Sequence, residues 1–231
     1  MAILEAKALS KRFGFKNALS AASVAIEPGR IVGLLGPNGS GKSTFLKICN
    51  GLLTPTSGEV IIDGNAPGAV TKTIVSYLPE RTYLPEYMTV AQIVDFFTDF
   101  YADFSREKAY TMLGNLNVDS RERLKTLSKG TKEKVQLILV MARQAKLYLL
   151  DEPIGGVDPA ARDYILNTIL KNYNPEASVI ISTHLIADIE QILDDVIFLK
   201  NGEVTRFGSA DDLREESGMS VDGLFREVFK C

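Results

Sequence analysis

A phosphate-binding pattern occupies residues 36–44 of this 231-residue chain. The residues that form it are Gly36, Pro37, Asn38, Gly39, Ser40, Gly41, Lys42, Ser43 and Thr44, and the first eight fit G-x-x-x-x-G-K-[ST]. Glycines lack a Cβ, so the backbone can adopt positive φ and turn its N–H groups toward an anion. In such a loop the lysine reaches the β- and γ-phosphates of a nucleotide, and the hydroxyl that follows binds Mg²⁺. We expect these roles of Lys42 and Ser43.

The sequence around this pattern has the form strand, loop, helix. Residues 31–35 are a short apolar run, which is typical of a buried strand. After the loop, Phe45, Leu46, Ile48 and Cys49 have the spacing of a helix face that packs on a sheet. This order points a helix N-terminus at an anion. A glycine-rich turn that matches the pattern by chance is the alternative.

Acidic and imidazole side chains follow other apolar runs of the chain. Residues 147–150 lead to Asp151 and Glu152, residues 74–78 lead to Glu80, and the run 179–181 leads to His184, the only histidine. In open α/β sheets, ligands bind at the carboxyl ends of the strands. We expect Asp151 to bind Mg²⁺ and Glu152 to polarise a water aimed at a γ-phosphate. His184 is a candidate γ-phosphate contact, although a lone histidine is often structural.

Strands are expected in residues 3–26, with a turn at residues 13–15. Phe13 either stacks on a nucleotide base or is an ordinary core residue. Later in the chain, residues 178–182 form an apolar strand, and Asn201 and Gly202 suit a type I′ turn between two strands. Asp158 and Pro159 are a typical N-cap and first residue of a helix.

Residues 81–146 have a helical pattern. Thr89 is expected to cap a helix that runs to Phe104, and Ser105 is expected to cap the next one. The aromatic residues of the first helix fall on one face, which predicts a packed lobe core rather than an exposed partner surface; they are Phe96, Phe97, Phe100, Tyr101 and Phe104.

A further helix is expected from residues 127–131 to Ala145, and lysines crowd its start. Lys129, Lys132 and Lys134 lie where cations oppose the helix dipole. They form either a solvated patch or a place where an anion docks from outside the chain.

Composition limits the class of protein. The chain is 45% hydrophobic and 24% charged, which suits one globular domain. A net charge of −3 argues against nucleic acid as a partner. Cys49 and Cys231 form no disulfide framework, which fits a reducing cytoplasm. We expect no signal peptide, and no apolar run approaches the ~18 residues that span a bilayer, so a membrane role would need another chain.

Taken in order, these motifs resemble the nucleotide-binding subunit of an ABC transporter over essentially the whole chain. The resemblance rests on the phosphate loop, Glu80, the segment 127–131, the segment 147–152 and His184, and residues 155–158 resemble the family's D-loop. It implies an α/β fold: a P-loop NTPase with a RecA-like core, an N-terminal antiparallel β-subdomain and an inserted α-helical subdomain. The implied single domain has its core and β-subdomain at about 1–80 and 147–210, the helical subdomain at about 81–146 and a tail at 211–231.

The resemblance also implies a mechanism. Two subunits face each other head to tail and clamp ATP and Mg²⁺ between them. The loop residues 36–44 and Phe13 bind the nucleotide of one subunit, while Ser128 and Gly130 of the other touch its γ-phosphate. Glu152 and His184 are the implied catalytic residues, and Ser43, Glu80 and Asp151 are the implied metal-site residues. Hydrolysis would drive a transmembrane permease at the inner face of the cell membrane.

Two departures from the family pattern stand out. Lys129 and Thr131 replace a glycine and a glutamine of the signature Leu-Ser-Gly-Gly-Gln, and Glu80 stands where glutamine is usual. Residues 77–80 resemble exporter-type members, which favours export. The alternatives are an ABC ATPase without transport, in translation, repair or cofactor assembly, and another phosphate-loop protein such as a small kinase or GTPase.

Overall fold

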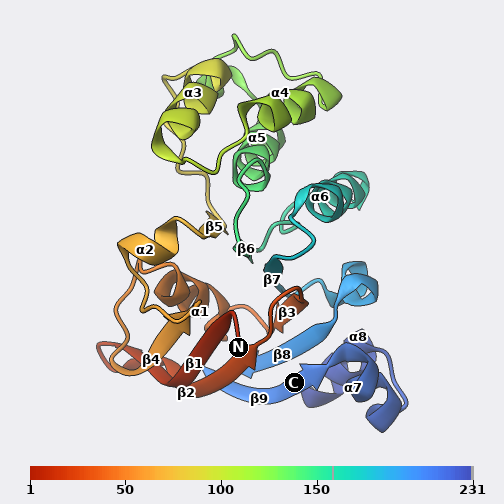
Figure 1. Cartoon of the computed structure of the whole chain (residues 1–231). Helices are drawn as coiled ribbons and strands as arrows, with labels where there is room; N and C mark the ends of the chain where they lie inside the picture. Colours follow the sequence, from red (N-terminus) through yellow and green to blue (C-terminus); the bar gives the residue numbers. More distant parts are fainter. Residues whose placement is uncertain (158, 230–231) are drawn as a thin grey trace.

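The apolar strands of the chain assemble into two β-sheets, which the computed structural model describes for residues 1–157 and 159–229 (Figure 1). In spatial order, the antiparallel sheet contains β2 (Lys16–Ile26), β1 (Leu4–Phe13) and β4 (Ser57–Ile62). In spatial order, the larger sheet contains β5 (Val75–Leu78), β6 (Leu147–Asp151), β7 (Ser178–Thr183), β3 (Ile31–Leu35), β8 (Asp195–Lys200) and β9 (Glu203–Ser209).

Strands β5, β6, β7, β3 and β8 run parallel, and β9 is an antiparallel edge strand. The register pairs Leu35 of β3 with Thr183 of β7, and Asp151 of β6 with Ser182 of β7. The carboxyl ends of these strands therefore meet at one edge of the sheet, and the residues that follow each strand are brought together there.

The larger sheet is a middle layer, covered on both faces. All residues of β3, β6 and β7 are buried, as continuous apolar runs in a parallel sheet should be. Successive residues of β6 alternate between two cores: Leu149 packs in the core that includes α1 and the antiparallel sheet, and Leu150 packs in the core that includes the other helices.

The helices are α1 (Lys42–Cys49), α2 (Ala69–Lys72), α3 (Val90–Phe100), α4 (Arg106–Asn115), α5 (Lys129–Met141), α6 (Pro159–Asn172), α7 (Ala210–Ser217) and α8 (Val221–Val228). Three short 3₁₀-helices cover Leu124–Thr126, Ile186–Asp188 and Glu190–Ile192. In Figure 1, α3, α4 and α5 form a group at the opposite end of the molecule from the antiparallel sheet. Within the described residues, no helix combines the length and the hydropathy that crossing a bilayer requires.

The predicted helix starts are confirmed. Thr89 forms a capping box with Gln92, with hydrogen bonds of 2.9 and 3.2 Å in the two directions. Ser105 and Ser128 are the N-caps of α4 and α5. The start of α6 at Pro159 also agrees, whereas its predicted cap, Asp158, lies outside the described residues.

Two predicted helix ends are wrong. The expected helix to Phe104 ends at Phe100, and the one to Ala145 ends at Met141. In both cases the chain leaves the helix to pair with a distant segment: Ser105 N donates to Ala142 O at 2.8 Å, and Gln144 N donates to Asp103 O at 2.9 Å. These bonds replace the helical hydrogen bonds that the longer helices would have made.

The aromatic residues in and just after α3 do not share one buried face. Phe97 and Phe104 are buried, but Phe96 and Phe100 are exposed and stack on each other with their ring centroids 5.9 Å apart. The prediction of a packed lobe core is therefore correct for only part of the set, because Phe96 and Phe100, one helical turn apart, lie on the outer face of α3.

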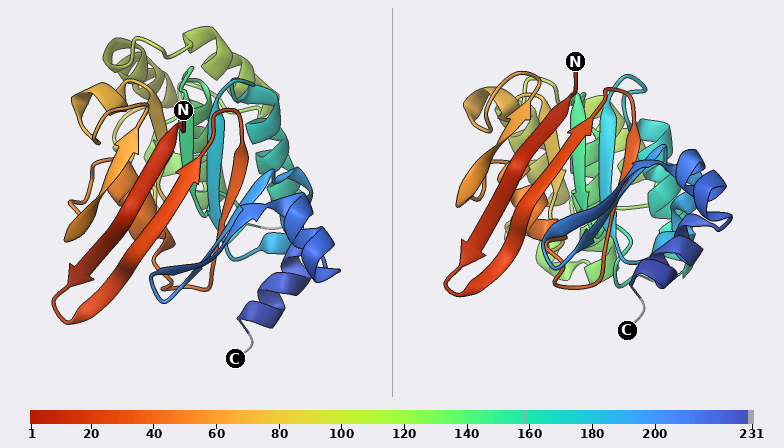
Figure 2. Two further views of the ribbon diagram at one scale, coloured as in Figure 1. Left: turned by 60° about the horizontal axis from the view of Figure 1, so that its bottom comes forward. Right: turned by 90° about the horizontal axis from the view of Figure 1, so that it is seen from below.

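The C-terminal part of the chain begins with the predicted hairpin. Asn201 and Gly202 between β8 and β9 have φ values of 50° and 84°, as a type I′ turn requires. Two helices, α7 and α8, follow, and Figure 2 shows them packed beside β8 and β9, away from the β1–β2 hairpin.

Arg143 ties the helical group to the larger sheet. Its side chain is 4% exposed, and it pairs with Asp103 at 3.0 Å and donates to the carbonyl of Val75 at 2.6 Å. It also donates to the carbonyls of Lys72 and Thr73 and lies 3.9 Å from the ring centroid of Tyr101. One cation therefore satisfies the carboxylate of Asp103 and three backbone carbonyls of residues 72–75.

Replacing Arg143 tests this tie. Arg143→Met should destabilise the chain by about 3–5 kcal/mol, because Asp103 and buried carbonyls lose their partner. We expect the Tm to fall by roughly 10 °C in a thermal scan. The matched control is Arg121→Met, which removes an exposed pair with Asp119 and should leave the Tm essentially unchanged. Equal Tm values for wild type and Arg143→Met would show that Arg143 does not stabilise the contact between the helical group and the larger sheet.

Candidate active site

The loop between β3 and α1 is shaped by its glycines. Gly39 has a φ of 82°, and Gly41, the N-cap of α1, has a φ of 113°. A Cβ on Gly41 would lie 2.4 Å from the carbonyl oxygen of Ala18, so no other residue fits there. The first N–H groups of α1 have no partner within the helix and open toward the loop, which makes this end of α1 suitable for an anion.

Lys42, the first residue of α1, is almost fully buried. Its side chain is 5% exposed, and its Nζ donates to the carbonyl oxygens of Gly36 at 2.7 Å and Pro37 at 3.3 Å. The same Nζ forms an ion pair with Glu152 Oε1 at 3.2 Å. The ammonium group thus lies between the loop and the end of β6.

Asp151, the last residue of β6, is 1% exposed and accepts two hydrogen bonds at Oδ1. The donors are Ser43 Oγ at 3.0 Å and Ser182 Oγ at 2.7 Å. Its second oxygen, Oδ2, is buried without a hydrogen-bond partner in the part of the chain that the structure describes. A buried carboxylate oxygen with unused lone pairs, beside a serine hydroxyl, offers the hard oxygen donors that Mg²⁺ prefers.

Burial raises the pKa of the Asp151 carboxyl above its ordinary value. The hydrogen bonds from Ser182 and Ser43 lower this pKa, whereas the negative charges of Glu80 and Glu152 raise it further. The net increase in pKa means that the ionised carboxylate is costly to hold here and that a bound cation would relieve the cost.

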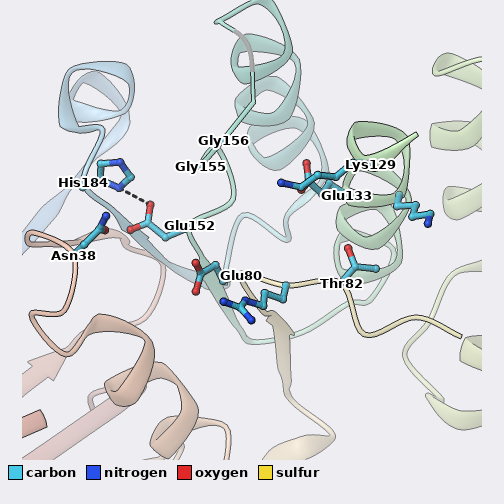
Figure 3. Close-up of a pocket in the computed structure, with 11 residues that line it drawn as sticks. Asn38, Glu80, Thr82, Lys129, Glu133, Glu152, Gly155, Gly156 and His184 are labelled. Atoms are coloured by element: carbon cyan, nitrogen blue, oxygen red, sulfur yellow. Dashed lines mark hydrogen bonds and ion pairs between the residues drawn. The ribbon is translucent and has the colours of Figure 1, made fainter. Parts of the chain in front are cut away.

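Glu152 directly follows β6 in a left-handed backbone conformation, with a φ of 50°. Its N–H lies 3.0 Å from the carbonyl oxygen and 3.1 Å from Oγ of Ser182. Its Oε2 lies 3.0 Å from His184 Nδ1, and Figure 3 shows the two side chains turned toward each other. A Cβ at Gly155 would lie 3.3 Å from Glu152 Cβ, so the glycine leaves room for this arrangement.

Two of the clefts that the described residues form at this edge have volumes of several hundred Å³. One, of about 340 Å³, runs along the loop and α1 to Phe13 and Lys16 at the end of the β1–β2 hairpin. Phe13 is half-exposed in it, so the alternative of an ordinary core residue is wrong. The other, of about 600 Å³, separates Glu152 and His184 from Lys129 and Glu133 on α5 (Figure 3). Asn38 and Glu80 line both clefts, together with Glu152.

The matches to known proteins agree with this geometry. Residues 19–155 match a family model described as ABC transporter. The chain is 33% identical over 243 residues to the ABC-type transporter ATP-binding protein EcsA of Bacillus subtilis (strain 168), with 100% of this chain and 98% of that protein covered. It is 29% identical over 210 residues to the SkfA peptide export ATP-binding protein SkfE of the same organism, with 88% of each chain covered.

A solved structure titled as the ATP-binding subunit of an ABC transporter superposes on this chain with a TM-score of 0.88 at 30% identity. The match covers 99% of this chain and 100% of the other. The chain belongs to the ABC transporter family. As an ATP-binding subunit of that family, it hydrolyses ATP to drive transport, and its fold is the predicted α/β fold of the P-loop NTPases.

The structure brings most of the ABC subunit's predicted site residues together, but not all. The loop, Phe13, Glu80, Asp151, Glu152 and His184 lie along the two clefts or contact residues that do. Among the described residues, Ser128 and Gly130 do not line either cleft, although Lys129 between them lines the larger one. Of the three lysines near the start of α5, Lys132 pairs with Glu86 at 2.7 Å and Lys134 lies over the ring of Tyr164.

The sequence interpretation missed two features of this site. One is Ser182, whose hydroxyl donates to Asp151 and whose backbone binds the N–H of Glu152. A small polar residue near the end of an apolar strand is a weak signal that could have indicated it. The other is the contact between Lys42 and Glu152, which are 110 positions apart and which no local pattern connects.

The raised pKa of Asp151 leads to a prediction about stability. Because the folded-state pKa exceeds the unfolded one, the folded chain binds this proton more tightly, and stability is lost as the pH rises through the folded pKa. Asp151→Asn removes the ionisable group, so the variant does not lose this stability as the pH rises. In excess EDTA without nucleotide at pH 7, we expect a higher Tm than wild type, by about 2–4 °C for each kcal/mol relieved.

The difference in Tm should shrink as the pH falls toward and below the unfolded pKa of about 3.9, because the wild-type carboxyl then becomes protonated in both states. The matched control is Asp119→Asn, which changes an exposed carboxylate paired with Arg121 and should not raise the Tm at pH 7. A lower Tm for Asp151→Asn at pH 7 would show that burying this charge is not costly.

Proposed function

We propose that the subunit binds ATP with Mg²⁺ at the edge where β3, β5, β6 and β7 end, and that two copies act together to drive export through a membrane permease. The observation that carries the proposal is the convergence of a buried ammonium, a buried carboxylate and a second carboxylate on one glycine-rich loop. The ammonium suits the phosphates, the buried carboxylate suits a cation, and the second carboxylate suits an attacking water.

The nucleotide would lie along the cleft of about 340 Å³. The loop N–H groups and Lys42 would hold the β- and γ-phosphates, and the half-exposed ring of Phe13 would stack on the adenine. Ser43 and Asp151 would hold Mg²⁺, with Glu80 beside them. When bound, Mg²⁺ supplies positive charge that offsets the charge of the phosphates.

Glu152 would act as the general base. It would accept a proton from a water while the water oxygen bonds to the γ-phosphorus, the bond from that phosphorus to the bridging oxygen breaks, and ADP leaves with the bonding electrons. His184 would orient the carboxylate through Nδ1, and its other ring nitrogen would remain for the γ-phosphate.

The second copy would complete the site. Ser128 caps α5 and is exposed, as is Lys129, whose side chain is 85% accessible. Because Ser128 and Gly130 line neither of these two clefts among the residues that the structure describes, we expect them to face the γ-phosphate bound by a partner copy. Lys129 would add positive charge to that interface.

The permease would dock beside the exposed aromatic residues of the helical group. Next to Phe100 lies a groove of about 470 Å³ that is lined by Leu52, Tyr83 and Tyr101 and by the basic residues Lys47, Lys72, Arg81 and Arg143. Exposed apolar patches rimmed by polar residues mark interaction sites, and aromatic residues and arginine are enriched in protein interfaces. Docking there would hold the subunit at the inner face of the cell membrane. Export is favoured because a relative, SkfE, is named for peptide export.

The role of Glu152 is tested by Glu152→Gln. The amide keeps the shape of the side chain but cannot accept a proton at neutral pH. We expect steady-state ATP hydrolysis to fall by at least about 100-fold, the usual contribution of a general base, while ATP binding persists. Phosphate release and binding of a fluorescent ATP analogue measure the two properties, and wild-type turnover would remove Glu152 from this role.

Dimer formation is tested in the same background, because ATP is not consumed. With saturating ATP and Mg²⁺, light scattering should give twice the monomer mass for Glu152→Gln, and the monomer mass without ATP. Adding Ser128→Arg should keep ATP binding but prevent the dimer, since a bulky side chain would fill the interface. A monomer of Glu152→Gln at saturating ATP would contradict a dimer of identical chains.

A further inference from the structure

The phosphate-binding lysine and the second carboxylate of the site are bound to each other. Lys42 Nζ lies 3.2 Å from Glu152 Oε1. Three oxygens surround the ammonium: Glu152 Oε1 in the ion pair, and the carbonyl oxygens of Gly36 and Pro37 as hydrogen-bond acceptors. The other oxygen of Glu152 is held by His184.

This contact competes with both proposed roles. An ammonium held by this carboxylate and by two carbonyl oxygens must give up at least one partner before a phosphate oxygen can take its place. A carboxylate with both oxygens engaged is poorly placed to accept a proton from water. Lys42 can therefore bind phosphate fully, and Glu152 can act as a base, only after the pair has separated.

The pair is built into the fold. The side chains of Lys42 and Glu152 are 5% and 11% exposed, so water screens their attraction weakly. Glu152 is held in its left-handed conformation by the hydrogen bonds of its N–H to Ser182, and Gly155 leaves space beside it. These restraints place the carboxylate against the loop rather than in solvent.

We propose that Glu152 sets the nucleotide affinity of the subunit by competing with nucleotide phosphate for Lys42. The inference rests on the proposed nucleotide site and adds a second role to Glu152. An incoming phosphate replaces the carboxylate on Lys42 and thereby frees the base. After hydrolysis, the return of the carboxylate to Lys42 favours the departure of ADP, so the subunit binds ADP less tightly than its loop alone would allow.

Binding of ADP in excess EDTA tests the competition, because ADP is not hydrolysed and no divalent cation contributes. Glu152→Gln keeps the shape of the side chain and removes its charge. By isothermal titration calorimetry we expect ADP to bind this variant about tenfold more tightly than wild type, which corresponds to about 1.4 kcal/mol. Unchanged or weaker ADP binding would overturn the proposal.

Glu133→Gln is the matched control. Glu133 lines the same large cleft as Glu152, but its ion pair is with Lys129 at 3.8 Å. Its replacement removes one negative charge near the site without touching Lys42, so ADP affinity should stay within about twofold of wild type. An equal gain in both variants would mean that general repulsion of the phosphates, not the contact with Lys42, sets the affinity.

Thermal scans provide a second readout. Without ADP, Glu152→Gln should have a lower Tm than wild type, because the buried Lys42 loses its counter-ion. With ADP, its gain in Tm should exceed that of wild type. Glu152→Asp keeps the charge but shortens the side chain by one methylene, so it should bind ADP with intermediate affinity. This variant replaces the glutamine variant if the latter folds poorly. Wild-type ADP affinity in Glu152→Asp would count against the contact with Lys42.

The outcomes separate this inference from the proposed function. If Glu152→Gln binds neither ADP nor ATP, the proposed nucleotide site is wrong. If it dimerises with ATP and lacks turnover but binds ADP as wild type does, the site stands and only the competition for Lys42 is refuted.

Discussion

Lys42 carries a positive charge into a place where its side chain is only 5% exposed, and that charge has to be compensated. The glycine-rich loop supplies two carbonyl oxygens, and the end of β6 supplies the carboxylate of Glu152. The parallel register of β3, β7 and β6 brings these groups to one edge of the sheet. The ion pair between Lys42 and Glu152 therefore depends on the order of the strands. In the proposed mechanism, the chemistry of the site depends on the separation of this pair.

The same edge holds more negative charge than it neutralises. Asp151 is buried with one oxygen unpartnered in the described part of the chain; burial raises its pKa most, and the negative charges of Glu80 and Glu152 raise it further. Such an arrangement costs stability, and proteins retain it where a ligand will use it. A metal–nucleotide complex carries both a cation for Asp151 and anions for Lys42, so a single ligand can offset the excess negative charge and bind the ammonium.

Much of this site could be predicted from the sequence, because local signals specify it. The loop is a contiguous motif, and each strand is a short apolar run with its polar residue directly after it. What could not be predicted depends on contacts between distant residues. The contact between Arg143 and Asp103, 40 positions apart, joins the segments that follow α3 and α5. Both helices end earlier than the periodicity of the sequence indicates. Ser182 reaches Asp151 across 31 positions, and helical spacing alone could not show that Phe96 and Phe100 face outward.

The position of Lys42 in a crystal structure with Mg²⁺ and a non-hydrolysable ATP analogue is the most direct test of the central claim. We expect Nζ to have left the carboxylate of Glu152 and to contact β- and γ-phosphate oxygens, with Ser43 and Asp151 turned toward the cation. A triphosphate bound in the loop while Lys42 still holds Glu152 would contradict the claim that one ammonium serves the two partners in turn.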